Sequence, residues 1–302
     1  MKEKILQTGG KTPLIGVITL ADQEKFNGCA LILLNSGIHH HVGYARLSVK
    51  LTRAAARLGL LGVRFDFSGI GDSPVSVHLG GDNRKRAGGE LCSVMDHLEE
   101  NEGIKSFVVG GICYGADIAM ETSWRDSRIK GLIQLDAHAY PTMKSLAYKA
   151  WHKSLKALDL SFLAQKSRQL LEQGANGSSL EGVSMVKGRI IRPRKLVEME
   201  LRRLIERKVE FFYVFTNGGT GGYAYKEQLY DMFSLDREKW QLSLTYFPDS
   251  DHLLTGPRHQ KELLSGFLDW VSCHFAKNVK KDFIGDKVAR EENPHDEASS
   301  GL

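Results

Sequence analysis

A cysteine between two glycines is the clearest sign of chemistry in this sequence. The motif Gly-Ile-Cys-Tyr-Gly at residues 111–115 follows a short apolar run at 105–110 and precedes a helical pattern. This order of strand, sharp turn and helix is typical of a nucleophile elbow, with Cys113 in the place that serine usually takes. Side chains at the two glycine positions of such a strained turn would collide with the neighbouring strand and helix. The N-terminus of the following helix favours a thiolate, so the sequence predicts that Cys113 is a nucleophile.

An activated nucleophile needs a general base, and His252 is the candidate. It follows the last expected strand, residues 241–247, and precedes a helical pattern that begins at Pro257. The loops that follow parallel strands lie at one edge of a sheet, so we expect His252 to lie at the same edge as Cys113. Such a pair suits attack on an ester or thioester carbonyl, with His252 moving the proton.

Two other motifs suggest bound groups, and neither is complete. The adjacent histidines His39 to His41 suggest a metal, but neighbouring side chains of an extended segment point to opposite sides, so we expect none. Gly69 and Gly71 suggest a nucleotide, but Pro74 stands where a dinucleotide fingerprint has its third glycine, and no helical pattern begins there. We interpret this stretch as a structural turn and expect no redox cofactor.

The elements that must position these residues alternate along the chain. Seven short apolar runs are expected strands: 14–20, 29–34, 62–67, 105–110, 129–135, 209–215 and 241–247. Helical patterns at 44–58 and 89–100 lie between them. Residues 4–26 carry two glycines between extended runs and indicate an antiparallel hairpin at the sheet edge. The alternation predicts an α/β fold with a mostly parallel, doubly wound sheet.

This alternation stops over residues 137–208, which hold helical patterns and no convincing strand. The patterns lie at 143–158, 160–171 and 193–208. A connection between strand and helix usually has about 2 to 6 residues, so the segment predicts an inserted helical cap. Residues 1–136 and 209–283 would then form the core, and the polar residues 284–302 a disordered tail.

Four segments together resemble a bacterial branch of the α/β hydrolases that includes the exosortase-system-associated hydrolases. They are residues 34–44, 64–73, 111–117 and 136–142. The cysteine elbow also resembles those of dienelactone hydrolases and polyhydroxyalkanoate synthases. The resemblance covers about residues 29–275 and implies the α/β-hydrolase fold, with acyl hydrolysis or transfer as the chemistry and no particular substrate.

The resemblance also implies where the oxyanion hole lies. In this superfamily, one amide comes from the loop after an early strand and the other from the residue after the nucleophile. These positions correspond here to Gly37 or Ile38 in the first loop and to Tyr114 in the second.

The third member of a catalytic triad is where the sequence departs from the family's pattern. The acid usually follows the penultimate strand, but residues 216–222 carry no carboxylate. Asp136 ends the strand after the elbow helix, a position that some hydrolases use. Asp231 and Asp251 are the alternatives, and a thiol nucleophile depends less on this acid than a hydroxyl does.

The positive charge of the chain is local. The 302 residues include 41 Lys and Arg against 36 Asp and Glu, and residues 187–208 carry nine basic and three acidic side chains. We interpret this segment as a solvated helix face, with the rim of a pocket for an anionic handle, such as carrier phosphopantetheine or coenzyme A, as the alternative. No aromatic residues interleave with a basic stripe, so we expect no nucleic acid partner.

Composition also bears on location. No stretch approaches the roughly 18 to 20 apolar residues that cross a bilayer, and the N-terminal residues lack the apolar centre of a signal peptide. The four cysteines are too scattered for a disulfide framework and form no C-x-x-C pair. We expect no membrane span and a cytoplasmic protein.

These observations favour an acyl hydrolase, an esterase or thioesterase, that forms an acyl-enzyme on Cys113 with a small-molecule substrate. An acyltransferase that uses a thioester donor is the first alternative, since the sequence does not separate water from another acceptor. A non-catalytic binding protein of the same fold is the second alternative. The oligomeric state and the pathway stay open.

Overall fold

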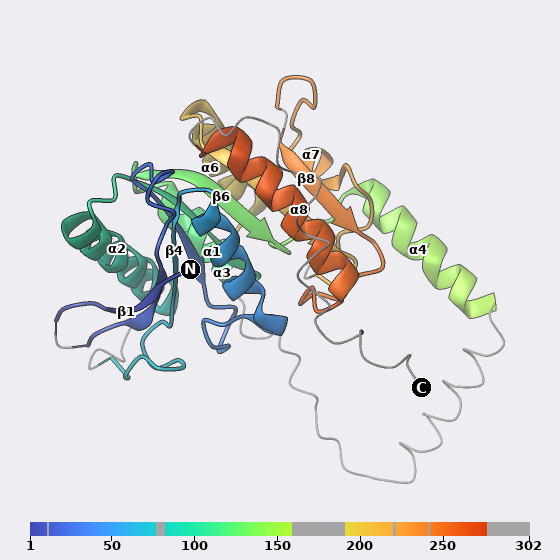
Figure 1. The fold of residues 1–302 in the computed structure, drawn as a ribbon. Helices are drawn as coiled ribbons and strands as arrows, with labels where there is room; N and C mark the ends of the chain where they lie inside the picture. The colour runs from blue at the N-terminus through green and yellow to red at the C-terminus, as the bar shows by residue number, and fades with distance from the viewer. Residues whose placement is uncertain (11, 77–81, 159–190, 220–221, 241, 277–302) are drawn as a thin grey trace, which may run out of the picture.

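The computed structural model describes residues 1–10, 12–76, 82–158, 191–219, 222–240 and 242–276. Within these ranges it describes all side chains except those of residues 152–158. The described residues build a central sheet with helices on both faces (Figure 1). The sheet has eight strands in the order β1-β2-β4-β3-β5-β6-β7-β8. The strands are β1 (Glu3–Gln7), β2 (Ile15–Thr19), β3 (Cys29–Leu34), β4 (Leu61–Phe65), β5 (Ser106–Ile112), β6 (Ile129–Leu135), β7 (Glu210–Thr216) and β8 (Ser243–Phe247).

Strands β3 to β8 run parallel to one another, and β1 and β2 form an antiparallel edge in which β2 pairs with β4. Glu3 pairs with Thr19 and Gln7 with Ile15, so the hairpin expected from the two glycines is confirmed. All seven expected strands form, within a few residues of their expected bounds. The predicted mostly parallel, doubly wound α/β fold is therefore confirmed.

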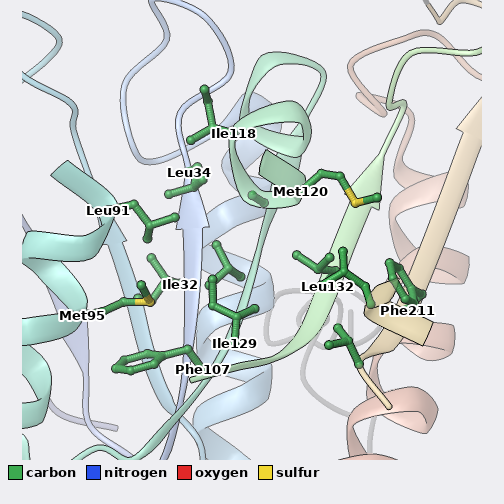
Figure 2. Close-up of a cluster of buried hydrophobic side chains, with 14 of the residues drawn as sticks. Ile32, Leu34, Leu91, Met95, Phe107, Ile118, Met120, Ile129, Leu132 and Phe211 are labelled. Carbon is green, nitrogen blue, oxygen red and sulfur yellow. The ribbon is translucent and has the colours of Figure 1, made fainter. Parts of the chain in front are cut away.

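Strand β3 shows why its sequence is apolar without a break. Its six residues are all buried, because both faces of the sheet are covered. Ile32 and Leu34 point to the face that α2 (Asn83–Glu102) and α3 (Tyr114–Ser123) cover, where they pack among Leu91 and Met95 (Figure 2). Leu31 and Leu33 point to the opposite face, which α1 (Leu47–Arg57) and α8 (Pro257–His274) cover.

Helix α2 begins six residues before its expected start. The expectation placed Gly89 at the beginning, but the helix starts at Asn83. Asp82 caps it by accepting a hydrogen bond from the Arg84 amide at 2.9 Å. Gly88 and Gly89 therefore lie in the interior of the helix, where each lowers the stability relative to alanine.

The order of the strands creates a crevice at the carboxyl edge. The chain passes from β3 to β4 on one side and then returns to β5 on the other side of β3. The loops after β3 and β5 therefore diverge, and open parallel sheets bind their ligands at such a point. Cys113 follows β5 at this crevice.

Two of the three helices expected in residues 137–208 are described. They are α4 (Met143–Leu158), which extends away from the sheet in Figure 1, and α6 (Arg194–Glu206). Leu201 and Leu204 of α6 are fully buried in the core. The third expected helix, 160–171, and the expected tail, 284–302, lie outside the described residues, so the division into core, cap and tail stays a prediction.

The remaining short elements are a 3-10 turn at Tyr44–Arg46 before α1 and α7 (Gln228–Met232) between β7 and β8. Within the described ranges, none of the helices combines the length and the apolar character needed to span a membrane.

Candidate active site

Cys113 occupies a single-residue turn between β5 and α3. Its backbone has φ 55° and ψ −108°, a conformation that side chains other than glycine rarely adopt, and its amide donates to the Leu135 carbonyl at 2.9 Å. A Cβ added at Gly111 would lie 3.0 Å from the Leu34 carbonyl oxygen, and one at Gly115 would lie 2.8 Å from the Asn35 carbonyl oxygen. The expected geometry of the elbow, with its strain and its steric need for glycines, is confirmed.

His252 lies beside this elbow, on the loop after β8. Its Nδ1 donates to the carboxylate oxygen Oδ2 of Asp136 at 2.9 Å. That bond, followed by a hydrogen bond with Cys113, raises the pKa of His252 from 6.5 to about 9, although burial opposes the rise. The structure therefore brings Cys113, His252 and Asp136 together at the carboxyl edge of the sheet.

Asp136 is fully buried at the end of β6, and the loop after β7 surrounds its carboxylate. The Thr216 amide donates to Oδ1 at 2.6 Å, and the Thr216 hydroxyl donates to Oδ2. A Cβ at Gly219 would lie 2.9 Å from Oδ1, and one at Gly218 would lie 2.8 Å from the His252 amide nitrogen. The loop that carries no acid of its own thus holds the acid supplied by β6.

Thr216 and the glycines that follow it were not among the site residues expected from the sequence. The available signal was the composition of this loop, which lacks both a carboxylate and bulky side chains where the family places its acid.

The two alternative acids have other partners. Asp231 accepts hydrogen bonds from the Tyr225 hydroxyl at 2.7 Å and from Arg237 at 3.0 Å. Asp251 accepts from the amides of its own loop, including that of Leu253 at 2.8 Å. Among the three carboxylates left open by the sequence, Asp136 is the one that contacts the His252 ring.

The expected oxyanion segment forms a tight turn after β3. The His39 amide donates to the Ser36 carbonyl at 3.2 Å, and Gly37 adopts φ 60°, which favours glycine. Tyr114 is the first residue of α3, so its amide is among those that an α-helix leaves without an internal acceptor. Gly37, Ile38 and Tyr114 all line one cleft, and their role as an oxyanion hole stays a prediction.

The buried carboxylate of Asp66 anchors this turn. Oδ1 accepts from the Asn35 side chain and from the His41 amide, both at 2.7 Å, and Oδ2 accepts from His41 Nδ1 at 2.8 Å and from the Asp72 amide at 3.1 Å. Burial raises the pKa of Asp66, but these hydrogen bonds, that of His41 foremost, lower it to below its usual value of 3.8. The glycine-containing stretch after β4 is thus a structural turn that supports the turn after β3.

The side chains of His40 and His41 do not point to opposite sides, as they would in an extended segment. The rings of His40 and His41 lie 3.9 Å apart and both approach Asp66, because this segment is a turn. Together with Asp72, the four groups offer atoms within 4.8 Å of one another. The geometric reason for expecting no metal is therefore wrong, but Asp66 already accepts hydrogen bonds from several protein donors, and the absence of a metal stays a prediction.

Comparisons with solved structures identify the fold. An esterase of Pyrococcus furiosus is 16% identical with a TM-score of 0.56, over 89% of this chain and 90% of that one. The thioesterase domain from the curacin biosynthetic pathway is 14% identical with a TM-score of 0.54, over 89% and 99%. An α/β serine hydrolase without lid from Xanthomonas campestris is 14% identical with a TM-score of 0.51, over 90% and 94%. The chain therefore has the α/β-hydrolase fold.

Comparisons of the sequence itself give no match, either to models of protein families or to curated proteins. The fold alone does not name a substrate or an activity.

Proposed function

We propose that this protein is an acyl hydrolase that cleaves esters or thioesters through a covalent acyl-enzyme on Cys113. The observation that carries the proposal is the strained elbow of Cys113 beside a His252 ring that Asp136 holds by a 2.9 Å hydrogen bond. An imidazolium next to a cysteine favours the thiolate, which is the nucleophilic form.

The proposed acylation step uses each of these groups in one role. The Cys113 sulfur attacks the carbonyl carbon, and the oxygen takes up the negative charge between the amides of Tyr114 and of Gly37 or Ile38. The intermediate collapses when the bond to the leaving group breaks, and Nε2 of His252 gives its proton to that group. Asp136 keeps Nδ1 protonated and the ring in place.

Hydrolysis of the acyl-enzyme reverses these roles. Neutral His252 takes a proton from water, and the resulting hydroxide adds to the thioester carbonyl. The bond to the Cys113 sulfur then breaks and releases the free acid. This step restores the pair of Cys113 thiolate and protonated His252.

The presence of a buried acid removes the main argument for a non-catalytic binding protein. That alternative depended on the missing carboxylate in residues 216–222 and on the uncommon cysteine at the elbow, and Asp136 meets His252 from another strand. The esterase and thioesterase among the structural neighbours give the proposal further support, through the fold that they share with this chain.

A carrier or coenzyme A handle on the substrate receives little support. It depended on the basic residues of α6, and Arg202 donates to Glu198 and to the Phe233 carbonyl, while Arg203 lies over the ring of Trp124. Arg202 and Arg203 therefore hold α6 against the rest of the chain. The cytoplasmic location stays a prediction.

Intact-protein mass spectrometry with activated esters and acyl thioesters tests the proposal. We expect an acyl adduct on Cys113 that disappears in Cys113→Ala and forms much more slowly in His252→Ala. Cys273→Ala and His259→Ala are matched controls, since Cys273 is an exposed free cysteine and His259 pairs with Asp249 at 3.1 Å.

The lifetime of the adduct decides between the enzyme classes. An adduct that water removes within the turnover time identifies a hydrolase, and one that persists until an alcohol or amine is added identifies an acyltransferase. No adduct and no turnover across the panel would contradict both and leave the binding protein.

A further inference from the structure

A large cleft borders the proposed oxyanion hole. It has a volume of about 780 Å³, which is in the range of small-molecule sites, and lies among the loops after β3 and β4, the start of α2, and Tyr114. Its apolar lining consists of Ile38, Phe67, Ile70, Val75, Ala87 and Tyr114. Ile38 and Val75 are 83% and 59% exposed, so an apolar ligand in the cleft would remove large hydrocarbon side chains from water.

The strand order places this cleft and His252 on opposite sides of Cys113. Asp136 and His252 follow β6 and β8, which lie on one side of β5, whereas the cleft is built after β3 and β4, on the other side. A leaving group must lie next to His252 to receive its proton. The part of the substrate that remains on Cys113 therefore extends toward the cleft.

The charged side chains of the cleft have partners within the chain. Arg84 donates to Glu121 at 3.0 Å, and Arg86 pairs with Glu90 at 3.7 Å. Glu90 also accepts from the Ser68 amide at 3.0 Å. These positive charges are already paired with glutamates, so burying another charge beside them would cost its hydration with little in return, and the cleft favours an uncharged ligand.

Two other hollows in the described part of the chain fit this role less well. The one between α3, β6 and α6 has a volume of about 40 Å³, too small for an acyl chain. A second, of about 680 Å³, lies among Met1, Leu20 and Ala56. Ala56 is in the last turn of α1, at the opposite edge of the sheet from Cys113.

We propose that the cleft binds the acyl group of the substrate and selects an uncharged, apolar chain longer than acetyl. This inference rests on the proposed acyl chemistry and adds to it a substrate class. Each methylene that enters the cleft raises kcat/KM about fourfold until the cleft is filled.

A chain-length series tests the proposal. Acetyl, butyryl, hexanoyl and octanoyl esters of one phenol are compared in the wild type, in Val75→Asp and in Ile5→Asp. Ile5, which is 76% exposed on the edge strand β1, is the matched control for a charge placed on an exposed apolar position. A second series keeps the butyryl group and varies the alcohol, and succinyl and adipoyl esters supply charged acyl groups.

We expect kcat/KM to rise with chain length in the wild type and in Ile5→Asp, and this rise to be largely lost in Val75→Asp. The dependence on the alcohol should be the same in all three proteins. The proposal is overturned if Val75→Asp changes selectivity for the alcohol instead, if the wild type prefers acetyl, or if it prefers the charged acyl groups.

A binding experiment keeps the inference separate from the reaction. Alkyl amides of the same chain lengths retain the acyl group but resist hydrolysis, and we expect calorimetry with Cys113→Ala to show affinities that rise with chain length and depend on Val75. Such binding without turnover of any ester would refute the proposed function alone. Turnover through Cys113 with no effect of Val75 on chain length would refute the cleft assignment alone.

Discussion

Replacing Asp136 by asparagine tests the hydrogen bond that organises the site. The carboxylate is fully buried and accepts from His252 Nδ1 at 2.9 Å and from the Thr216 amide at 2.6 Å. Asparagine keeps the shape of this side chain but removes its charge and turns one acceptor into a donor. The substitution therefore withdraws the main interaction that favours the charged form of His252.

The pKa of His252 gives the size of the effect. Its rise from 6.5 to about 9 corresponds to about 3 kcal/mol in favour of the imidazolium. Asp136 is the largest cause, and an adjacent charge typically shifts a pKa by about 1 to 3 units. We expect the pKa of His252 in Asp136→Asn to fall to roughly 6 to 8. Acylation near neutral pH should slow by roughly 10²- to 10³-fold, somewhat less than for a serine nucleophile with the same change.

The same pKa predicts how stability depends on pH. A raised histidine pKa stabilises the fold fully below pH 6.5, and this contribution is lost as the pH rises through about 9. The difference in the free energy of unfolding between the wild type and Asp136→Asn should therefore be largest below pH 6.5, with the wild type more stable. The difference should shrink by up to about 3 kcal/mol toward pH 9 and above.

Nuclear magnetic resonance of ring-labelled histidine gives the pKa, and urea unfolding at several pH values gives the stability. Asp231→Asn and Asp251→Asn are the controls, because the structure gives both carboxylates other partners. If Asp136→Asn left the pKa of His252 near 9, or if Asp251→Asn lowered it equally, the proposed hydrogen bond would not be what holds the base.

Two further predictions concern the elbow and the oxyanion loop. Gly115→Ala should lower the free energy of unfolding by about 1 to 3 kcal/mol and slow acylation, because its Cβ would lie 2.8 Å from the Asn35 carbonyl oxygen. Gly89→Ala, in an open position of α2, should instead raise the free energy of unfolding by up to about 1 kcal/mol. If urea unfolding showed that both variants lose the same amount of stability, the steric argument would be refuted. Asp66→Asn should cost roughly 1.5 to 3 kcal/mol above pH 4 through weakened bonds to His41 and Asn35. Since the pKa of Asp66 is below 3.8, this loss should disappear in unfolding experiments at lower pH, and a loss that persists there would contradict the role of the charge.

The parts of the fold that local chemistry determines could be predicted from the sequence. A strand covered on both faces is mostly apolar, so the sequence predicts β3 and β6 with their observed bounds. The elbow could be predicted because its two glycines are required by contacts within a few residues of Cys113 and with the adjacent strand.

The rest depends on contacts that the sequence does not encode locally. Choosing Asp136 over Asp251 requires the order of the strands, since Asp136 meets His252 from 116 residues away along the chain. The directions of the His40 and His41 side chains depend on a turn built around Asp66. The sequence suggested an extended segment at this place, so their common direction could not be predicted. The cleft combines loops from β3 and β4 with α2, and no motif marks such a surface.

Asp66 and Asp136 hold the two halves of the proposed site separately. Each is a fully buried carboxylate just after a strand, and each accepts hydrogen bonds from a backbone amide and a histidine ring. Asp66 holds the loop of the proposed oxyanion amides, whereas Asp136 holds His252, the proposed base. Asp66→Asn should therefore slow acylation while the pKa of His252 stays near 9, and Asp136→Asn should lower that pKa and leave the preference for acyl chain length intact. A change of both properties in either variant would mean that the two loops move as one unit.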